Sequence, residues 1–91
     1  MRYAAGQSIK NPVDMIKVVT KRYGLSQVDG ENILEDMENT KRFNRYGLVN
    51  GITRLAHLAE DYDRAADYER AGGALLEITD ADWKIIADEA A

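Results

Sequence analysis

The segment from Lys41 to Tyr46, Lys-Arg-Phe-Asn-Arg-Tyr, interleaves basic and aromatic side chains. Cations contact phosphates and aromatic rings stack on bases, so this composition is typical of single-stranded nucleic-acid binding. An apolar helical pattern follows the segment, and the N–H groups at a helix start favour an anion. In the alternative interpretation Phe43 and Tyr46 fill the core while the cations pair with acids. The nucleic-acid-binding candidates are Lys41, Arg42, Phe43, Arg45 and Arg54.

A cluster of acidic residues lies in the second half of the chain. Asp61-Tyr62-Asp63 together with Asp67 resembles a calcium loop, but the glycine and the terminal glutamate that such a loop needs are missing. Acids are favoured at helix N-caps and in first turns, so these residues are expected to begin a helix. An acidic helical face can also occupy a basic nucleic-acid channel of a partner protein. The partner-binding candidates are Asp61, Asp63, Asp67 and Glu69.

The charge alternates in sign along the chain, although the net charge is only −4. Residues 1–22 carry +4, residues 23–40 carry −5, residues 41–57 carry +4 and residues 58–91 carry −7. In one interpretation, these blocks of charge of one sign steer charged partners towards the protein. In the other, the charges only solvate helix faces and pair across helices. The overall acidity favours a protein partner, because nucleic-acid binders usually have a clearly basic footprint.

The side-chain groupings of common enzymes are missing from the sequence. Without cysteine there is no thiolate nucleophile and no sulfur ligand, and the single histidine, His57, cannot form a two-histidine metal site. No phosphate loop or nucleophile elbow is present. We therefore expect no enzymatic activity and no cofactor. Four polar residues with helical spacing are interpreted as the solvated side of a helix, and the alternative is a stripe that recognises a polar ligand or partner: Asn50, Arg54, His57 and Asp61.

Helices must position these groups, because apolar residues recur at helical spacing and only residues 2–9 leave room for a strand. Asn11-Pro12 is expected to open the first helix, which Gly24 ends. Ser26 and Asp29 form a capping box for the second helix. The side chains of this second helix that are expected to point inward are Val28, Leu34 and Met37.

The second half of the chain is expected to hold three more helices. The third runs from about Asn44 to Asp61, and the fourth begins near Asp63 and is interrupted or ended by Gly72-Gly73. Thr79 caps the last helix, in which Trp83 is expected to anchor the core. The sequence thus predicts an all-α protein, a compact bundle of four to five short helices. Residues 1–10 are expected to be a flexible or extended segment and residues 11–91 a single helical domain.

No apolar run is long enough to cross a bilayer, and the start of the chain lacks the apolar stretch of a secretory signal. We therefore expect a protein of the cytoplasm that has no membrane partner. The broad apolar face of the third helix is also suited to pairing with a second copy, which makes a homodimer one of the expected assemblies.

One pattern in the second half of the chain consists of Tyr46, Gly47, Asn50, Thr53 and the Glu-Arg-Ala-Gly-Gly segment at residues 69–73. This pattern resembles the C-terminal part of a phage- and plasmid-encoded protein family of unknown function. Gly51 stands where that family usually has alanine. The resemblance covers residues 44–76 and implies a role in a mobile genetic element, and hence the cytoplasm of a host cell. It implies either assistance in DNA transactions or inhibition of a host defence system, as anti-CRISPR proteins do.

Two functions of different classes follow from these observations. The first is a protein-binding inhibitor or adaptor that acts on a host or phage protein complex through its acidic helices. The second is a nucleic-acid-binding accessory domain that uses the basic-aromatic segment, with an affinity that falls steeply with salt.

Overall fold

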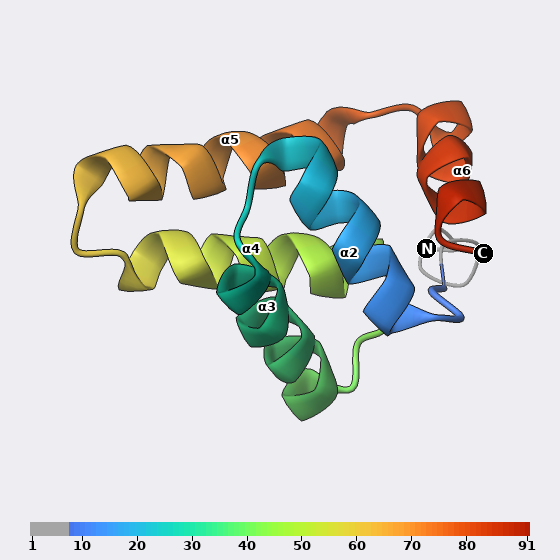
Figure 1. Ribbon diagram of the computed structural model, residues 1–91, viewed down its shortest axis with the longest axis horizontal. Coiled ribbons are helices and arrows are strands. Elements are labelled where there is room, and N and C mark those ends of the chain that lie inside the picture. Colours follow the sequence, from blue (N-terminus) through green and yellow to red (C-terminus); the bar gives the residue numbers. More distant parts are fainter. Residues whose placement is uncertain (1–7) are drawn as a thin grey trace.

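The computed structural model describes residues 8–91, which form five helices joined by short connections (Figure 1). Outside these helices, the described residues contain a single isolated antiparallel bridge, between Ser8 and Asn44, and no strand. The predicted all-α bundle of four to five short helices is therefore confirmed. The helices are α2 (Pro12–Tyr23), α3 (Gln27–Thr40), α4 (Arg45–Leu58), α5 (Tyr62–Glu77) and α6 (Asp80–Glu89).

Helix α4 lies at the centre of the arrangement. It packs along α5 as an antiparallel hairpin and also contacts α3, while α2 packs on α3 and on α6 (Figure 1). The connection between α4 and α5 forms one end of the molecule, which measures 35 × 25 × 25 Å. No helix within residues 8–91 is long and apolar enough to span a membrane.

The core draws at least one side chain from each helix. Trp83 is buried, as predicted, but Val28 is exposed. The buried side of α3 runs through Ile33 and Met37, and Val28 lies on the opposite side of this helix because successive residues are about 100° apart. The largest fully buried side chains are Val19, Ile33, Met37, Leu48, Ile52, Leu75 and Ile86.

The predicted helix starts are largely confirmed by their caps. Ser26 and Asp29 form the expected capping box, and the Thr79 hydroxyl accepts a hydrogen bond from the Asp82 N–H. The third helix ends at Leu58, earlier than expected, because Asp61 already caps α5 by accepting from the Asp63 N–H. The Asn44 side chain accepts from the Gly47 N–H, so side-chain oxygens cap four of the five N-termini, all except that of α2.

Gly72-Gly73 does not interrupt the fourth helix, contrary to the sequence prediction, since α5 continues to Glu77. A Cβ atom on Gly72 would lie 3.6 Å from both Ile52 and Thr53 of α4, so this glycine lies at the contact between the two helices. A glycine costs a helix only about 1 kcal/mol relative to alanine, and packing of a helix face outweighs that cost.

The two ends of the described chain are held together. Asn11 occupies the N-cap position of α2, but its side chain does not cap that helix; its amide donates a hydrogen bond to the carbonyl of Ala90. Ile9 is buried, and its N–H donates to the carbonyl of Phe43 at 2.8 Å. Of the segment expected at 1–10, residues 1–7 lie outside the described part of the chain.

Candidate partner-binding site

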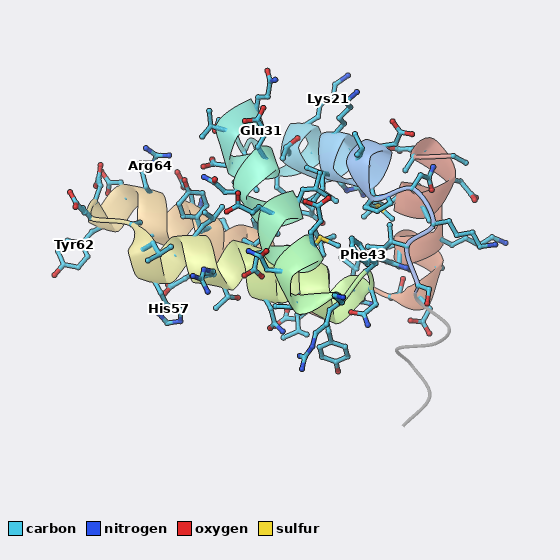
Figure 2. All side chains as sticks on the ribbon, turned by 90° about the horizontal axis from the view of Figure 1, so that it is seen from below. Lys21, Glu31, Phe43, His57, Tyr62 and Arg64 are labelled. Atoms are coloured by element: carbon cyan, nitrogen blue, oxygen red, sulfur yellow. The ribbon has the colours of Figure 1, made fainter. Side chains whose placement is uncertain are left out.

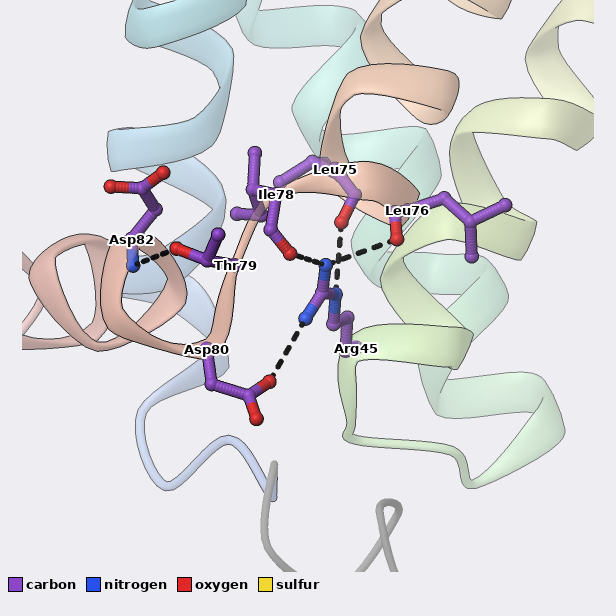
Figure 3. A network of polar contacts seen from close by, with 7 residues as sticks. All are labelled: Arg45, Leu75, Leu76, Ile78, Thr79, Asp80 and Asp82. Carbon is purple, nitrogen blue, oxygen red and sulfur yellow. Dashed lines mark hydrogen bonds and ion pairs between the residues drawn. The ribbon is translucent and has the colours of Figure 1, made fainter.

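Arg45, predicted as a nucleic-acid contact, is buried and is directed at the C-terminal end of α5 (Figure 3). Its Nε donates to the carbonyl of Leu75 at 2.9 Å, and its Nη2 donates to the carbonyls of Leu76 at 3.1 Å and Ile78 at 2.6 Å. Its Nη1 lies 3.7 Å from the carboxylate of Asp80. The prediction for this residue is therefore wrong, because its donors already bond within the fold.

The physical reason for this placement is the chemistry of a helix C-terminus. The last carbonyls of a helix lack partners within the helix, and the end carries partial negative charge. Arg45, at the first turn of α4, faces the last turn of α5 because the two helices run antiparallel. One guanidinium can donate to several such carbonyls at once. Arg45 is thus a structural residue that joins two helices.

The other basic candidates differ from the aromatic candidate in exposure. Lys41 and Arg42 are exposed, whereas Phe43 is half-buried against the core. Arg54, on α4, is exposed but lies 3.8 Å from the carboxylate of Asp36. Phe43 and Tyr46, the two aromatic residues of the segment, are both half-buried, so the segment offers no fully exposed ring beside its cations.

A buried polar network that the sequence did not reveal lies between α3 and α5. The Tyr68 hydroxyl donates to the buried carboxylate of Asp29 at 2.7 Å, and this carboxylate also accepts from the Ser26 N–H. Arg64 donates to the Tyr68 oxygen at 2.7 Å and lies 3.5 Å from Asp29. The capping-box pattern identified Asp29, but its partner is 39 residues away in the sequence.

The same network alters the acidity of its members. Burial raises the pKa of Tyr68, and the hydrogen bond to Asp29 raises it further, while Arg64 opposes the shift. The hydrogen bond to Tyr68 raises the pKa of Arg64. The neutral tyrosine and the charged arginine are therefore the forms that the fold favours, and the network joins the first turn of α3 to the first two turns of α5.

The end of the α4–α5 hairpin carries exposed apolar side chains among acids. We call this surface the acidic tip and define it as Leu58, Glu60, Asp61, Tyr62 and Asp63. The Tyr62 side chain extends away from the end of the hairpin (Figure 2), and this residue is 93% exposed. Leu58 is 66% exposed. Asp61 and Asp63, two of the four predicted acidic candidates, lie here.

The other two acidic candidates occupy different surroundings on α5. Asp67 lies one turn beyond Asp63 on the same side and forms an ion pair with Arg70 at 2.9 Å. Glu69 is exposed but is about 200° around the helix axis from Asp67, because successive residues are about 100° apart. The four candidates therefore do not share a single face.

Three of the four polar residues expected on the third helix, Asn50, Arg54 and His57, are exposed on α4. Asp61 is also exposed, but it lies beyond the end of α4 and caps α5 instead. Within the described part of the chain, no group of three His, Asp or Glu side chains is placed to hold a metal ion.

The acidic tip combines uncovered apolar side chains with charge of one sign. Comparison of the chain with protein families, with curated proteins and with solved structures finds no match.

Proposed function

We propose that this chain is a non-enzymatic protein-binding module whose binding surface is the acidic tip. The observation that carries the proposal is the 93% exposure of Tyr62, next to Leu58 and among three acids. Tyrosine is one of the residue types that dominate the binding energy of protein interfaces, and such anchors lie inside a polar rim. Tyr62 has the position of such an anchor at the end of the hairpin.

The charge of the rim indicates the chemistry of the partner. Glu60, Asp61 and Asp63 are exposed and flank Tyr62 in the sequence, and an acidic rim accelerates association with a basic surface. The matching surface is therefore a basic region that contains an apolar recess for Tyr62. A protein channel that holds nucleic acid has the required positive charge. Together with the resemblance to proteins of mobile elements, this suits an inhibitor of a host defence complex.

Photo-crosslinking tests the proposal directly. A photoreactive amino acid replaces Tyr62 in one version of the chain and Ile85 in another; Ile85 is 51% exposed on α6, so it serves as a control position. We expect a crosslinked protein partner from position 62 and none from position 85. Equal crosslinking from both positions would contradict the proposal.

Charge reversal tests the rim with a matched control. Glu60→Lys/Asp63→Lys should reduce binding of the crosslinked partner by about tenfold or more at low salt, because close charge pairs across an interface couple by more than about 1.5 kcal/mol. Glu35→Lys/Glu38→Lys changes the net charge of the chain by the same amount on exposed positions of α3. A loss of binding in both variants would show an effect of overall charge and not of the tip.

The nucleic-acid alternative has its own test. Fluorescent single- and double-stranded DNA is titrated with the chain and with Lys41→Ser/Arg42→Ser, which spares the buried Arg45. We expect that the DNA fluorescence does not change as either protein is added. Tight binding that weakens with salt, and that the double variant loses, would favour the accessory domain in DNA transactions instead.

A further inference from the structure

A groove runs between α2 and α3, on a part of the surface separate from the acidic tip. Its volume is about 570 Å³, within the range of roughly 300–1,000 Å³ that holds drug-sized ligands, so it can receive more than one side chain. Val13 and Ile16 of α2, Leu25 of the connection and Leu34 of α3 supply its apolar lining. The groove is open to solvent, and no described residue fills it.

Gly30 keeps this groove open at the point where the two helices approach. A Cβ atom at position 30 would lie 2.8 Å from the Ile16 Cγ2 atom and 3.1 Å from the Thr20 Cγ2 atom. The glycine therefore allows α3 to approach α2 closely and leaves no side chain over the floor of the groove. This also explains why a residue unfavourable to helices stands in the first turns of α3.

The charges that line the groove are mainly positive. Lys17 and Lys21 lie one turn apart on the α2 wall, and neither forms an ion pair within the described residues. Glu31 lines the α3 wall and accepts a hydrogen bond from Gln27 at 3.5 Å. Figure 2 shows Lys21 and Glu31 on the same side of the molecule, whereas Tyr62 points from the hairpin end. The groove thus combines an apolar floor with a net positive rim.

This is the surface chemistry that the acidic tip requires of its partner. We propose that the acidic tip of one copy of the chain docks in the α2–α3 groove of a second copy. Tyr62 and Leu58 enter the apolar groove, and the carboxylates of the tip face Lys17 and Lys21. The inference rests on the proposed function of the tip and identifies a second copy as one of its partners.

Tip and groove are different surfaces, so the contact is head-to-tail. Tyr62 is 93% exposed and therefore does not occupy the groove of its own chain. A head-to-tail contact leaves one free groove and one free tip in every pair, and it generates a ring or an open chain of copies instead of a symmetric dimer. The assembly also has to weaken with salt, because its charges lie at the surface.

Sedimentation velocity of the full chain and of two variants tests this arrangement. The groove variant Lys17→Glu/Lys21→Glu keeps its tip, and the tip variant Leu58→Ser/Tyr62→Ser keeps its groove; all four positions are exposed, so both variants should retain the helical circular-dichroism spectrum. At protein concentrations up to about 1 mM we expect the native chain to form species larger than a dimer. Each variant alone should stay monomeric.

Mixing the two variants is the decisive step. The intact tip of the groove variant can enter the intact groove of the tip variant, and no further contact remains, so the mixture should stop at a one-to-one dimer. A native chain that stays monomeric up to about 1 mM would overturn the inference. A mixture that stays monomeric, or that assembles beyond a dimer, would also overturn it.

A variant that makes the groove more positive, instead of less positive, provides an independent check. Glu31→Lys adds positive charge to the same groove and should strengthen self-association by about tenfold at low salt. Unchanged or weaker association would contradict the charge matching. Crosslinking from position 62 to another protein in a chain that does not self-associate would leave the proposed function standing and reject only the second copy as a partner.

Discussion

The guanidinium carbon of Arg45 lies 5.5 Å from the centre of the Trp83 ring. The same guanidinium donates to three carbonyls at the C-terminal end of α5. One side chain from the start of α4 therefore contacts the end of α5 and the indole of α6. Cation–π contact and charge-assisted hydrogen bonds act together at this junction.

Replacement of Arg45 by methionine should lower the free energy of unfolding by about 2–3 kcal/mol, because buried carbonyls lose their donors. Urea denaturation followed by Trp83 fluorescence measures the change, since Trp83 is the single tryptophan of the chain. Arg42→Met is the matched control at an exposed position and should stay within about 0.5 kcal/mol of the native chain. Equal losses in both variants would contradict the structural role of Arg45.

Gly47 is expected to tolerate no larger residue. A Cβ atom at this position would lie 1.9 Å from the carbonyl oxygen of Arg42, a backbone atom that cannot rotate away. Gly47→Ala should therefore cost about 3 kcal/mol, at the upper end of the usual range for overpacking. Thermal denaturation by circular dichroism measures the loss. A melting temperature equal to that of the native chain would show that this turn can shift.

Gly73 is expected to behave in the opposite way. Apart from Gly73 itself, its two neighbours in the chain and the nearby backbone of its own helix, no atom lies within 4 Å of the Cβ that an alanine would place there, and the residue lies inside α5. Gly73→Ala should therefore raise the free energy of unfolding by about 0.5–1 kcal/mol through helix propensity and a less flexible unfolded chain. Urea denaturation of both variants should show a higher free energy of unfolding for Gly73→Ala than for the native chain, and a lower one for Gly47→Ala. A destabilised Gly73→Ala chain would indicate a contact that the structure does not show.

Tyr68→Phe should cost about 1–2 kcal/mol at neutral pH, because the buried carboxylate of Asp29 loses a donor. The raised pKa of Tyr68 adds a pH dependence. Above its ordinary value of 10.0 the unfolded chain releases the phenolic proton first, so stability is lost as the pH rises from there through the pKa of the folded state. The phenylalanine variant lacks this loss.

Urea midpoints between about pH 8 and pH 11 measure the effect for the native chain and for Tyr68→Phe. The difference between the two proteins should be constant below the ordinary pKa of tyrosine and should shrink above it. A difference that stays constant over the whole range would show that Tyr68 titrates alike in the folded and unfolded chains.

The local signals of the sequence predicted the helices well. Ser26, Asn44 and Thr79 each accept a hydrogen bond from the N–H group three residues further on, so short sequence patterns contain all the information that these caps need. The prediction that Gly72-Gly73 interrupts or ends the fourth helix was wrong because helix propensity describes an isolated helix. The contact of Gly72 with α4 appears only after the hairpin has formed.

The candidate site depended more strongly on three-dimensional neighbours. Arg45 and Leu75 are 30 residues apart, so a sequence pattern that showed a cation beside aromatic residues could not show which carbonyls it meets. Exposure is likewise a tertiary property: Tyr62 and Tyr68 are six positions apart on the same helix, but one is exposed and the other buried. Asp61 and Asp63 of the tip were predicted, whereas Glu60, the apolar anchors and the α2–α3 groove were not.

The hydrogen bond from Asn11 to the carbonyl of Ala90 has a consequence for how the molecule opens. The first and last helices of the described chain contact each other, so neither can detach without breaking contacts made by the other. Local unfolding usually begins at chain ends, where few contacts hold the backbone. Here hydrogen exchange should be slow in α2 and α6 together, and a single cooperative opening should release both.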